Sequence, residues 1–102
     1  MRAFLISDSQ DVLHGLRFAG IEGVYVTEKQ AALDALHKCV ADEEIAVVLI
    51  TEKLKALCIH EVYEIMIERR VPLIVEIPAE GEASSAGRDM LDYIRDAMGL
   101  KT

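Results

Sequence analysis

The stretch IAVVLITE, at residues 45–52, decides the fold of this chain. Its first six residues are apolar, four of them are β-branched, and the run ends at Thr51 and Glu52. A continuous apolar run of this length is typical of a strand buried on both faces, as in parallel sheets covered by helices. Such sheets bind ligands just beyond the carboxyl ends of their strands. Thr51 and Glu52 therefore stand where an enzyme of this fold would carry its chemistry.

Composition restricts the class of protein and its partners. The 102 residues suit one domain, and a hydrophobic fraction of 52% is enough for a core. The net charge of −7 disfavours nucleic acid and anionic membrane surfaces as partners. No apolar run reaches the roughly 18–20 residues of a membrane helix, and the N-terminal run is too short for a signal peptide. We therefore expect a cytoplasmic protein, in which Cys39 and Cys58 are free and mostly buried.

Strand-like and helix-like segments alternate along the chain. Strands are predicted at 3–7, 23–26, 45–50 and 71–77, and helices at about 9–20, 27–42, 52–69 and 86–98. Asp8 or Ser9 is expected to cap the first helix, and Gly20 to end it. Thr27 and Gln30 have the spacing of a capping box for the second helix. The inward residues expected in the first and third helices are Val12, Leu13, Leu16, Ala19, Leu54, Leu57, Cys58, Val62, Ile65 and Met66.

This alternation predicts an α/β fold with a four-stranded parallel sheet. Right-handed crossovers leave few topologies, and we favour the flavodoxin- or receiver-like order 2-1-3-4 in three layers. The first helix then covers one face, and the second and third cover the other. We expect a single domain with a core at residues 1–78, a loop at 79–87 and a C-terminal helix at 88–102.

The strand ends carry little catalytic machinery. A phospho-accepting receiver domain needs an aspartate after its third strand and an acidic pair after its first, whereas this chain has Thr51-Glu52 and a single Asp8. The turn after the first strand has no glycine with which to approach a phosphate. Thr51 is interpreted as a helix cap and Glu52 as a first-turn acid that complements the helix dipole. We therefore predict no catalytic residue, no cofactor and no metal.

Histidines and cysteines do not converge in this topology. His14, His37 and His60 lie on three different helices, with His14 on the opposite face of the sheet from the other two. Cys58 and His60 are two residues apart on a helix and point in different directions. The segment with Ser84, Ser85 and Arg88 before the last helix is either an anion cradle or a flexible connector.

Apolar residues exceed what one inward stripe needs. In the third helix, Ile59, Tyr63 and Ile67 add to the inward set. The last helix has further apolar residues beyond its main stripe, at Tyr93, Ala97 and Leu100. Exposed apolar area of this kind often marks a protein partner, although a helix packed on two sides within the domain is an alternative.

Three segments together resemble a known family. GLRFAGI at 15–21 resembles the GFRLAGI segment of the F subunit of V-type (archaeal/vacuolar-type) ATPases and ATP synthases. VLITE at 48–52 and PLIVEIP at 72–78 are similar to that family's third strand end and fourth strand. The order and spacing of the segments extend the resemblance over nearly the whole chain. The loop at 79–87 departs from the family in being more acidic.

The resemblance implies a non-catalytic component of the central rotor stalk. Such a component binds the coiled-coil D subunit, turns inside the catalytic A/B hexamer, and couples ATP hydrolysis or synthesis to ion transport. It lies in the cytoplasm, peripheral to the membrane as part of the soluble ATPase sector. We expect the partner interface on the last helix, at Met90, Tyr93, Ile94, Ala97 and Met98.

Two other functions stay open on the sequence alone. The first is a stand-alone flavodoxin-like signalling or small-ligand-binding domain that uses Asp8, Thr51 and Glu52. The second is a small thiol- or phosphate-using enzyme built on Cys58 or on the segment from Ser84 to Arg88.

Overall fold

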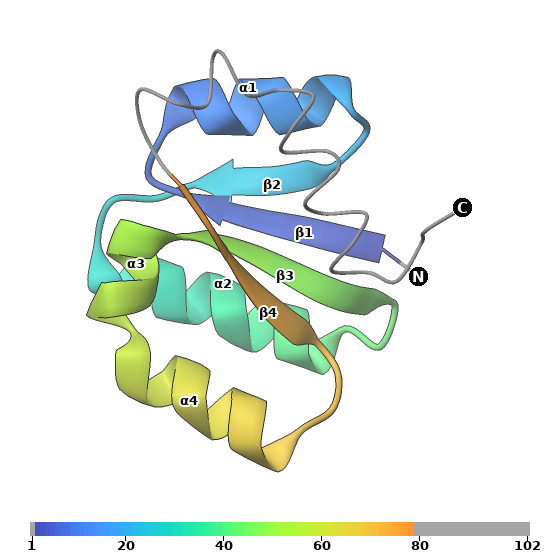
Figure 1. The fold of residues 1–102 in the computed structure, drawn as a ribbon, viewed down its shortest axis with the longest axis vertical. Helices are drawn as coiled ribbons and strands as arrows, with labels where there is room; N and C mark the ends of the chain where they lie inside the picture. The colour runs from blue at the N-terminus through green and yellow to red at the C-terminus, as the bar shows by residue number, and fades with distance from the viewer. Residues whose placement is uncertain (1, 79–102) are drawn as a thin grey trace.

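Four parallel strands form the centre of the molecule in a computed structural model, which describes residues 2–78. The strands are β1 (Arg2–Ser7), β2 (Glu22–Tyr25), β3 (Ile45–Thr51) and β4 (Leu73–Ile77). They lie side by side in the order β2-β1-β3-β4 (Figure 1), which confirms the predicted topology. Leu5 at the centre of β1 pairs with Gly23 on one side and Leu49 on the other. The apolar run that begins at Ile45 is thus a central strand, paired on both edges.

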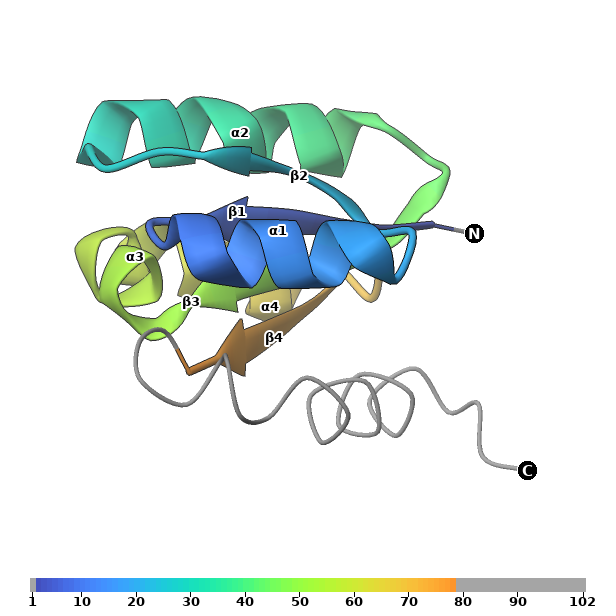
Figure 2. The same ribbon diagram turned by 90° about the horizontal axis from the view of Figure 1, so that it is seen from above.

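Helices cover both faces of the sheet, and they divide as expected. They are α1 (Gln10–Phe18), α2 (Lys29–Ala41), α3 (Glu52–Leu57) and α4 (Ile59–Glu68). One core cluster joins Leu13 and Leu16 of α1 to Leu49 of β3. The other joins α2, α3 and α4 to the opposite face, for example through Leu36, Val62 and Ile50. Figure 2 shows α1 and α2 on opposite sides of β1 and β2.

Local signals at the ends of α1 are confirmed. The hydroxyl of Ser9 accepts a hydrogen bond from the backbone N–H of Val12 at 3.3 Å, so Ser9 is the N-cap. Gly20 follows the helix with φ +87°, a conformation that glycine adopts without steric cost. Both signals act over a few residues, and nothing in the tertiary structure overrides them.

The capping box predicted for the second helix is wrong. The N-cap of α2 is Glu28, which makes no side-chain capping bond, so Thr27 lies one residue outside the helix. The amide of Gln30 instead donates to the carboxylate of Asp34 at 3.0 Å, one helical turn further along. A shift of one residue in the helix start is enough to remove the reciprocal geometry that a capping box needs.

The single helix predicted at 52–69 is two helices. The chain leaves helical geometry at Cys58, where φ is −110° and ψ is 28°, and α4 starts at the next residue. Cys58 is fully buried, and its N–H bonds to the carbonyls of Leu54 and Lys55. Leu54, Cys58 and Val62 keep a spacing of four residues across this break. The apolar pattern therefore continues unchanged and gives no sign of the break.

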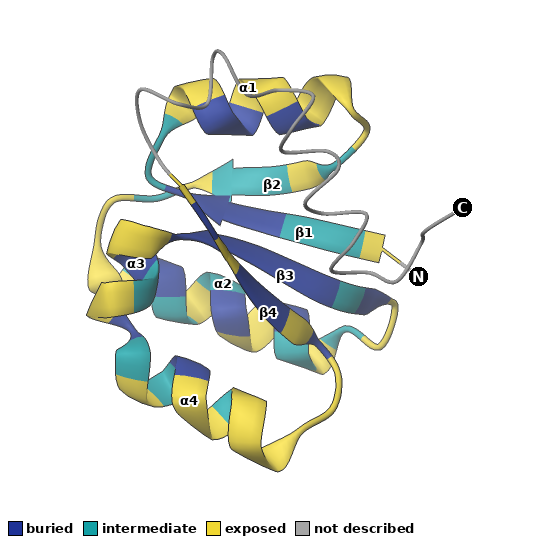
Figure 3. Ribbon diagram, viewed as in Figure 1, coloured by how far each residue is buried: buried dark blue, intermediate teal, exposed yellow. Residues whose placement is uncertain are grey.

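Three residues expected on inner helical faces are exposed. Ala19 lies just beyond α1, Leu57 ends α3, and Met66 sits on the outer half of α4. Figure 3 shows that buried residues concentrate in β1 and β3, whereas α4 is largely exposed. The inward positions predicted for Val62 and Ile65 of α4 are confirmed, because Val62 is buried and Ile65 packs against the same core cluster. The prediction for α4 is wrong only at Met66, which is 47% exposed.

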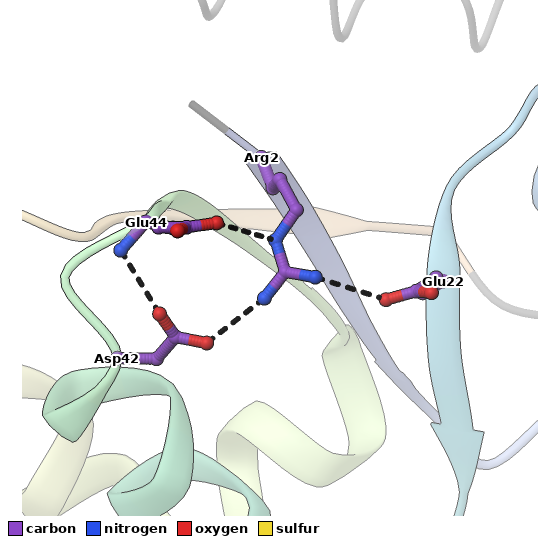
Figure 4. Close-up of polar contacts among 4 residues, drawn as sticks. All are labelled: Arg2, Glu22, Asp42 and Glu44. Atoms are coloured by element: carbon purple, nitrogen blue, oxygen red, sulfur yellow. Dashed lines mark hydrogen bonds and ion pairs between the residues drawn. The ribbon is translucent and has the colours of Figure 1, made fainter.

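An ion-pair cluster ties three elements together at the amino ends of the strands. The guanidinium of Arg2 contacts Asp42 at 2.8 Å, Glu22 at 3.3 Å and Glu44 at 3.9 Å (Figure 4). These acids come from β2 and from the turn between α2 and β3. The cluster is partly exposed and lies at the end of the sheet opposite to Thr51.

Candidate functional site

The strand-end junction is built around a buried hydroxyl. Thr51 is fully buried, and its Oγ1 accepts a hydrogen bond from the backbone N–H of Asp8 at 3.3 Å. Its backbone occupies the N-cap position of α3, but its side chain makes no capping bond. The hydroxyl therefore joins the end of β3 to the end of β1 instead of capping the helix as expected. Glu52 is exposed in the first turn of α3, as expected for an acid that complements the helix dipole.

The chain after β1 is held by a second hydroxyl. The Oγ of Ser7 donates to the carbonyl of Ser9 at 2.7 Å and accepts from the N–H of Ser9 at 2.8 Å. Ser7 is fully buried, and a buried hydroxyl needs hydrogen-bond partners. The turn itself supplies both of them, one acceptor and one donor. These contacts fix the turn that carries Asp8, and they leave the hydroxyl committed to the backbone.

Asp8 and Thr51 are thus brought together, whereas Glu52 faces solvent. One carboxylate oxygen of Asp8, Oδ1, is buried without a hydrogen-bond partner among the residues that the structure describes. Within residues 2–78, no three side chains of His, Cys, Asp or Glu are grouped so as to hold a metal ion. The junction therefore holds one buried carboxylate oxygen without a hydrogen-bond partner, and no assembled metal site, among residues 2–78.

The cysteines are free and buried, as predicted. Burial raises the pKa of the Cys39 thiol to about 11, with a further contribution from the negative charge of Asp42. Burial also raises the pKa of Cys58, and Glu61 adds to that effect. Because the thiolate is the nucleophilic form, both thiols are poorly reactive at neutral pH. His60 is exposed on α4 while Cys58 is buried, which further weakens the thiol-enzyme hypothesis.

A hollow of about 370 Å³ lies between α2 and the sheet at β1 and β2. Its lining includes the apolar side chains of Phe4, Val24 and Val26 and the basic residues Arg2 and Lys38. Sequence reasoning did not identify it, because its lining comes from elements far apart in the chain. The only sequence feature that bears on this hollow is the apolar spacing of each strand and helix. That spacing does not report how completely α2 covers β2.

The outer side of α4 carries large exposed apolar side chains. The exposed fractions are 53% for Tyr63, 47% for Met66 and 83% for Ile67. Among residues 2–78, Tyr63 and Ile67 are not packed on a second side, whereas Ile59 is half-buried. This exposure favours a surface for a protein partner as the interpretation of the apolar surplus on α4. Met66 was expected inside and adds to this surface. The interface residues expected on the last helix, from Met90 to Met98, lie outside the described residues.

The parallel strand order 2-1-3-4, with helices on both faces of the sheet, defines an α/β protein of the flavodoxin-like type within residues 2–78. The family model of the ATP synthase (F/14-kDa) subunit matches residues 4–94, and the chain belongs to that family. Among curated proteins, none is similar enough to count as a match. In the described part of the chain, no helix is both long and apolar enough to cross a membrane.

Proposed function

We propose that this chain is the non-catalytic central-stalk F subunit of a V-type ATPase or ATP synthase. It binds the coiled-coil D subunit, turns with it inside the A/B hexamer, and couples ATP hydrolysis or synthesis to ion transport. The observation that carries this proposal is the family match, which spans every described strand and helix from residue 4 onward. The exposed apolar side chains of α4 support a role in binding another protein.

The proposed mechanism is mechanical. The central strands β1 and β3 are paired on both sides, and their inner residues, such as Leu5 and Leu49, are fully buried. Close packing makes such a core stiff, so it transmits force without a chemical step of its own. The proposed location is cytoplasmic, peripheral to the membrane within the soluble ATPase sector.

Co-expression with the corresponding D subunit tests this function. We expect a stable heterodimer that elutes as one species in size-exclusion chromatography at micromolar concentration. Separate elution of the two proteins at that concentration would contradict the proposal.

The interface expected on the last helix is a separate proposal within this function. Tyr93→Glu combined with Ala97→Glu places two charges among its apolar positions, which should weaken the heterodimer while the isolated chain keeps its circular dichroism spectrum. If the double variant bound the D subunit as tightly as the wild type, the interface would lie elsewhere.

A ligand-binding role at the strand ends is the second candidate, and the unpartnered Oδ1 of Asp8 is the observation, made within residues 2–78, that favours it. Titration calorimetry with Mg²⁺, phosphodonors and nucleotides tests it directly. Heat release that disappears in Asp8→Ala would support this role, whereas absence of heat with all three would remove it.

A further inference from the structure

The exposed apolar residues of α4 form one continuous stripe. Tyr63 and Ile67 are four residues apart, and Met66 is three from Tyr63, so all three lie on neighbouring positions of one side of the helix. Ile59, four residues before Tyr63, is half-buried and extends the stripe to the start of α4. The stripe runs along the whole helix, which is about 15 Å long at 1.5 Å per residue.

An acidic stripe lies beside the apolar one. Glu64 and Glu68 each follow a residue of the apolar stripe and are four residues apart, and the half-buried Glu61 precedes Glu64 by three. None of these acids forms an ion pair with another residue in the range 2–78, although Arg69 and Arg70 follow the helix directly.

This charge pattern opposes the stability of α4 in the free chain. Like charges three or four residues apart repel on a helix, and an acid in the last turn opposes the helix dipole. Glu61 in the first turn of α4 complements the dipole, but Glu68 ends the helix, its last turn holds no basic residue, and no side chain caps its start. When one helix departs from several rules of helix stability at once, its surface is expected to serve function instead of stability.

We propose that this side of α4 is the docking surface for a helix of the coiled-coil partner, whose Lys and Arg side chains lie beside an apolar seam. The inference rests on the proposed function and names a second surface for the same partner, separate from the one proposed on the last helix. Apolar residues at i, i+4 and i+7 or i+8 fit the ridges of a second helix, and a row of basic residues neutralises Glu64 and Glu68. The charge of −7 on the whole chain favours the same basic partner.

Binding of the full chain to the D subunit, measured by titration calorimetry, tests the surface. Ile67→Asp introduces a charge into the apolar stripe and should weaken binding roughly 30-fold or more. Phe18→Asp is the matched control, because Phe18 is 95% exposed on α1, across the sheet from α4. We expect the control to bind like the wild type. An equal loss in both variants, or no loss in Ile67→Asp, would overturn the proposal.

Glu64→Lys separates binding from folding. It removes the repulsion of Glu64 with Glu61 and Glu68 and replaces it with attraction, so the melting temperature of the free chain should rise by about 1–5 °C. Affinity for the D subunit should nevertheless fall roughly 5- to 10-fold at about 50 mM salt, and by less at about 500 mM. Glu43→Lys makes the same charge change in an exposed turn and should leave affinity unchanged. Equal losses in Glu64→Lys and Glu43→Lys would indicate only a general charge effect and would overturn the proposal.

Other occupants of the surface give different results. If the wild-type chain were a dimer by light scattering and Ile67→Asp a monomer, a second copy would cover the stripe. If Ile67→Asp strongly lowered the melting temperature of the free chain, the chain itself would cover it. Either result overturns the proposal. If the wild-type chain did not bind the D subunit at all, the proposed function would be refuted. That result differs from one in which the wild type binds and substitutions on α4 have no effect, which would refute only the proposed surface.

Discussion

Gly23 lies where β2 packs closely against both the neighbouring strand β1 and the helix α1. A Cβ atom at this position would lie 2.7 Å from both the Cβ and the carbonyl oxygen of Leu5, and 3.0 Å from a methyl group of Leu13. Gly23→Ala must therefore push β2 away from β1 or α1, and we expect it to lower the free energy of unfolding by about 1–3 kcal/mol. Urea unfolding followed by circular dichroism measures the change.

Gly15 is the control for this substitution. It lies in α1, and a Cβ atom there would meet nothing within 4 Å. Gly15→Ala should raise stability by roughly 0.5–1 kcal/mol, because alanine is the better helix former. If both substitutions lowered the free energy of unfolding equally, the lack of space for a Cβ atom at Gly23 would not explain the loss.

Residue-scale predictions from the sequence succeeded where the cause is local. The Ser9 cap and the positive φ of Gly20 depend on adjacent backbone and were correct. The hydroxyl of Thr51 was assigned to its own helix but bonds to Asp8, which is 43 residues away in sequence. A short polar side chain satisfies its hydrogen bonds with whatever lies nearest, and only the paired strands place Asp8 there.

At the scale of elements, Arg2 links β1 to β2 and to the turn before β3. Arg2→Gln should cost at most about 1 kcal/mol in stability, because the side chain is 46% exposed and exposed ion pairs contribute little. The cost should shrink in about 1 M salt, which screens the pairs. Arg17→Gln on α1, where no ion pair is found among residues 2–78, is the matched control for thermal unfolding. A loss that is independent of salt would contradict an ionic origin.

Element boundaries were predicted less well than element types. All four strands and the strand order follow from apolar runs and their spacing, as the central run from Ile45 illustrates. The break at Cys58 does not, because both helices on either side keep the same apolar phase. The break sets where α4 begins, whereas the apolar spacing already places Tyr63 and Ile67 outside the inward stripe.

At the scale of the whole described molecule, residues 2–78, burial is concentrated in the central strands and α4 is largely exposed (Figure 3). In hydrogen exchange of the free chain we therefore expect the amides of β1 and β3 to exchange most slowly, and those of α4 much faster. Addition of the D subunit should slow exchange in α4 and leave α1 unchanged. Slowing in α1 alone would place the partner on the opposite face of the sheet.

The sequence by itself determined the α/β class, the parallel order 2-1-3-4 and the family resemblance, because apolar periodicity and chain handedness restrict how strands and helices pack. Only the tertiary structure decided that Thr51 bonds across the sheet, that the chain bends at Cys58, and that Tyr63, Met66 and Ile67 are exposed. The physical reason is that periodicity reports which residues avoid water on average. It does not report which distant group supplies a hydrogen bond, or where a helix with continuous apolar spacing changes direction.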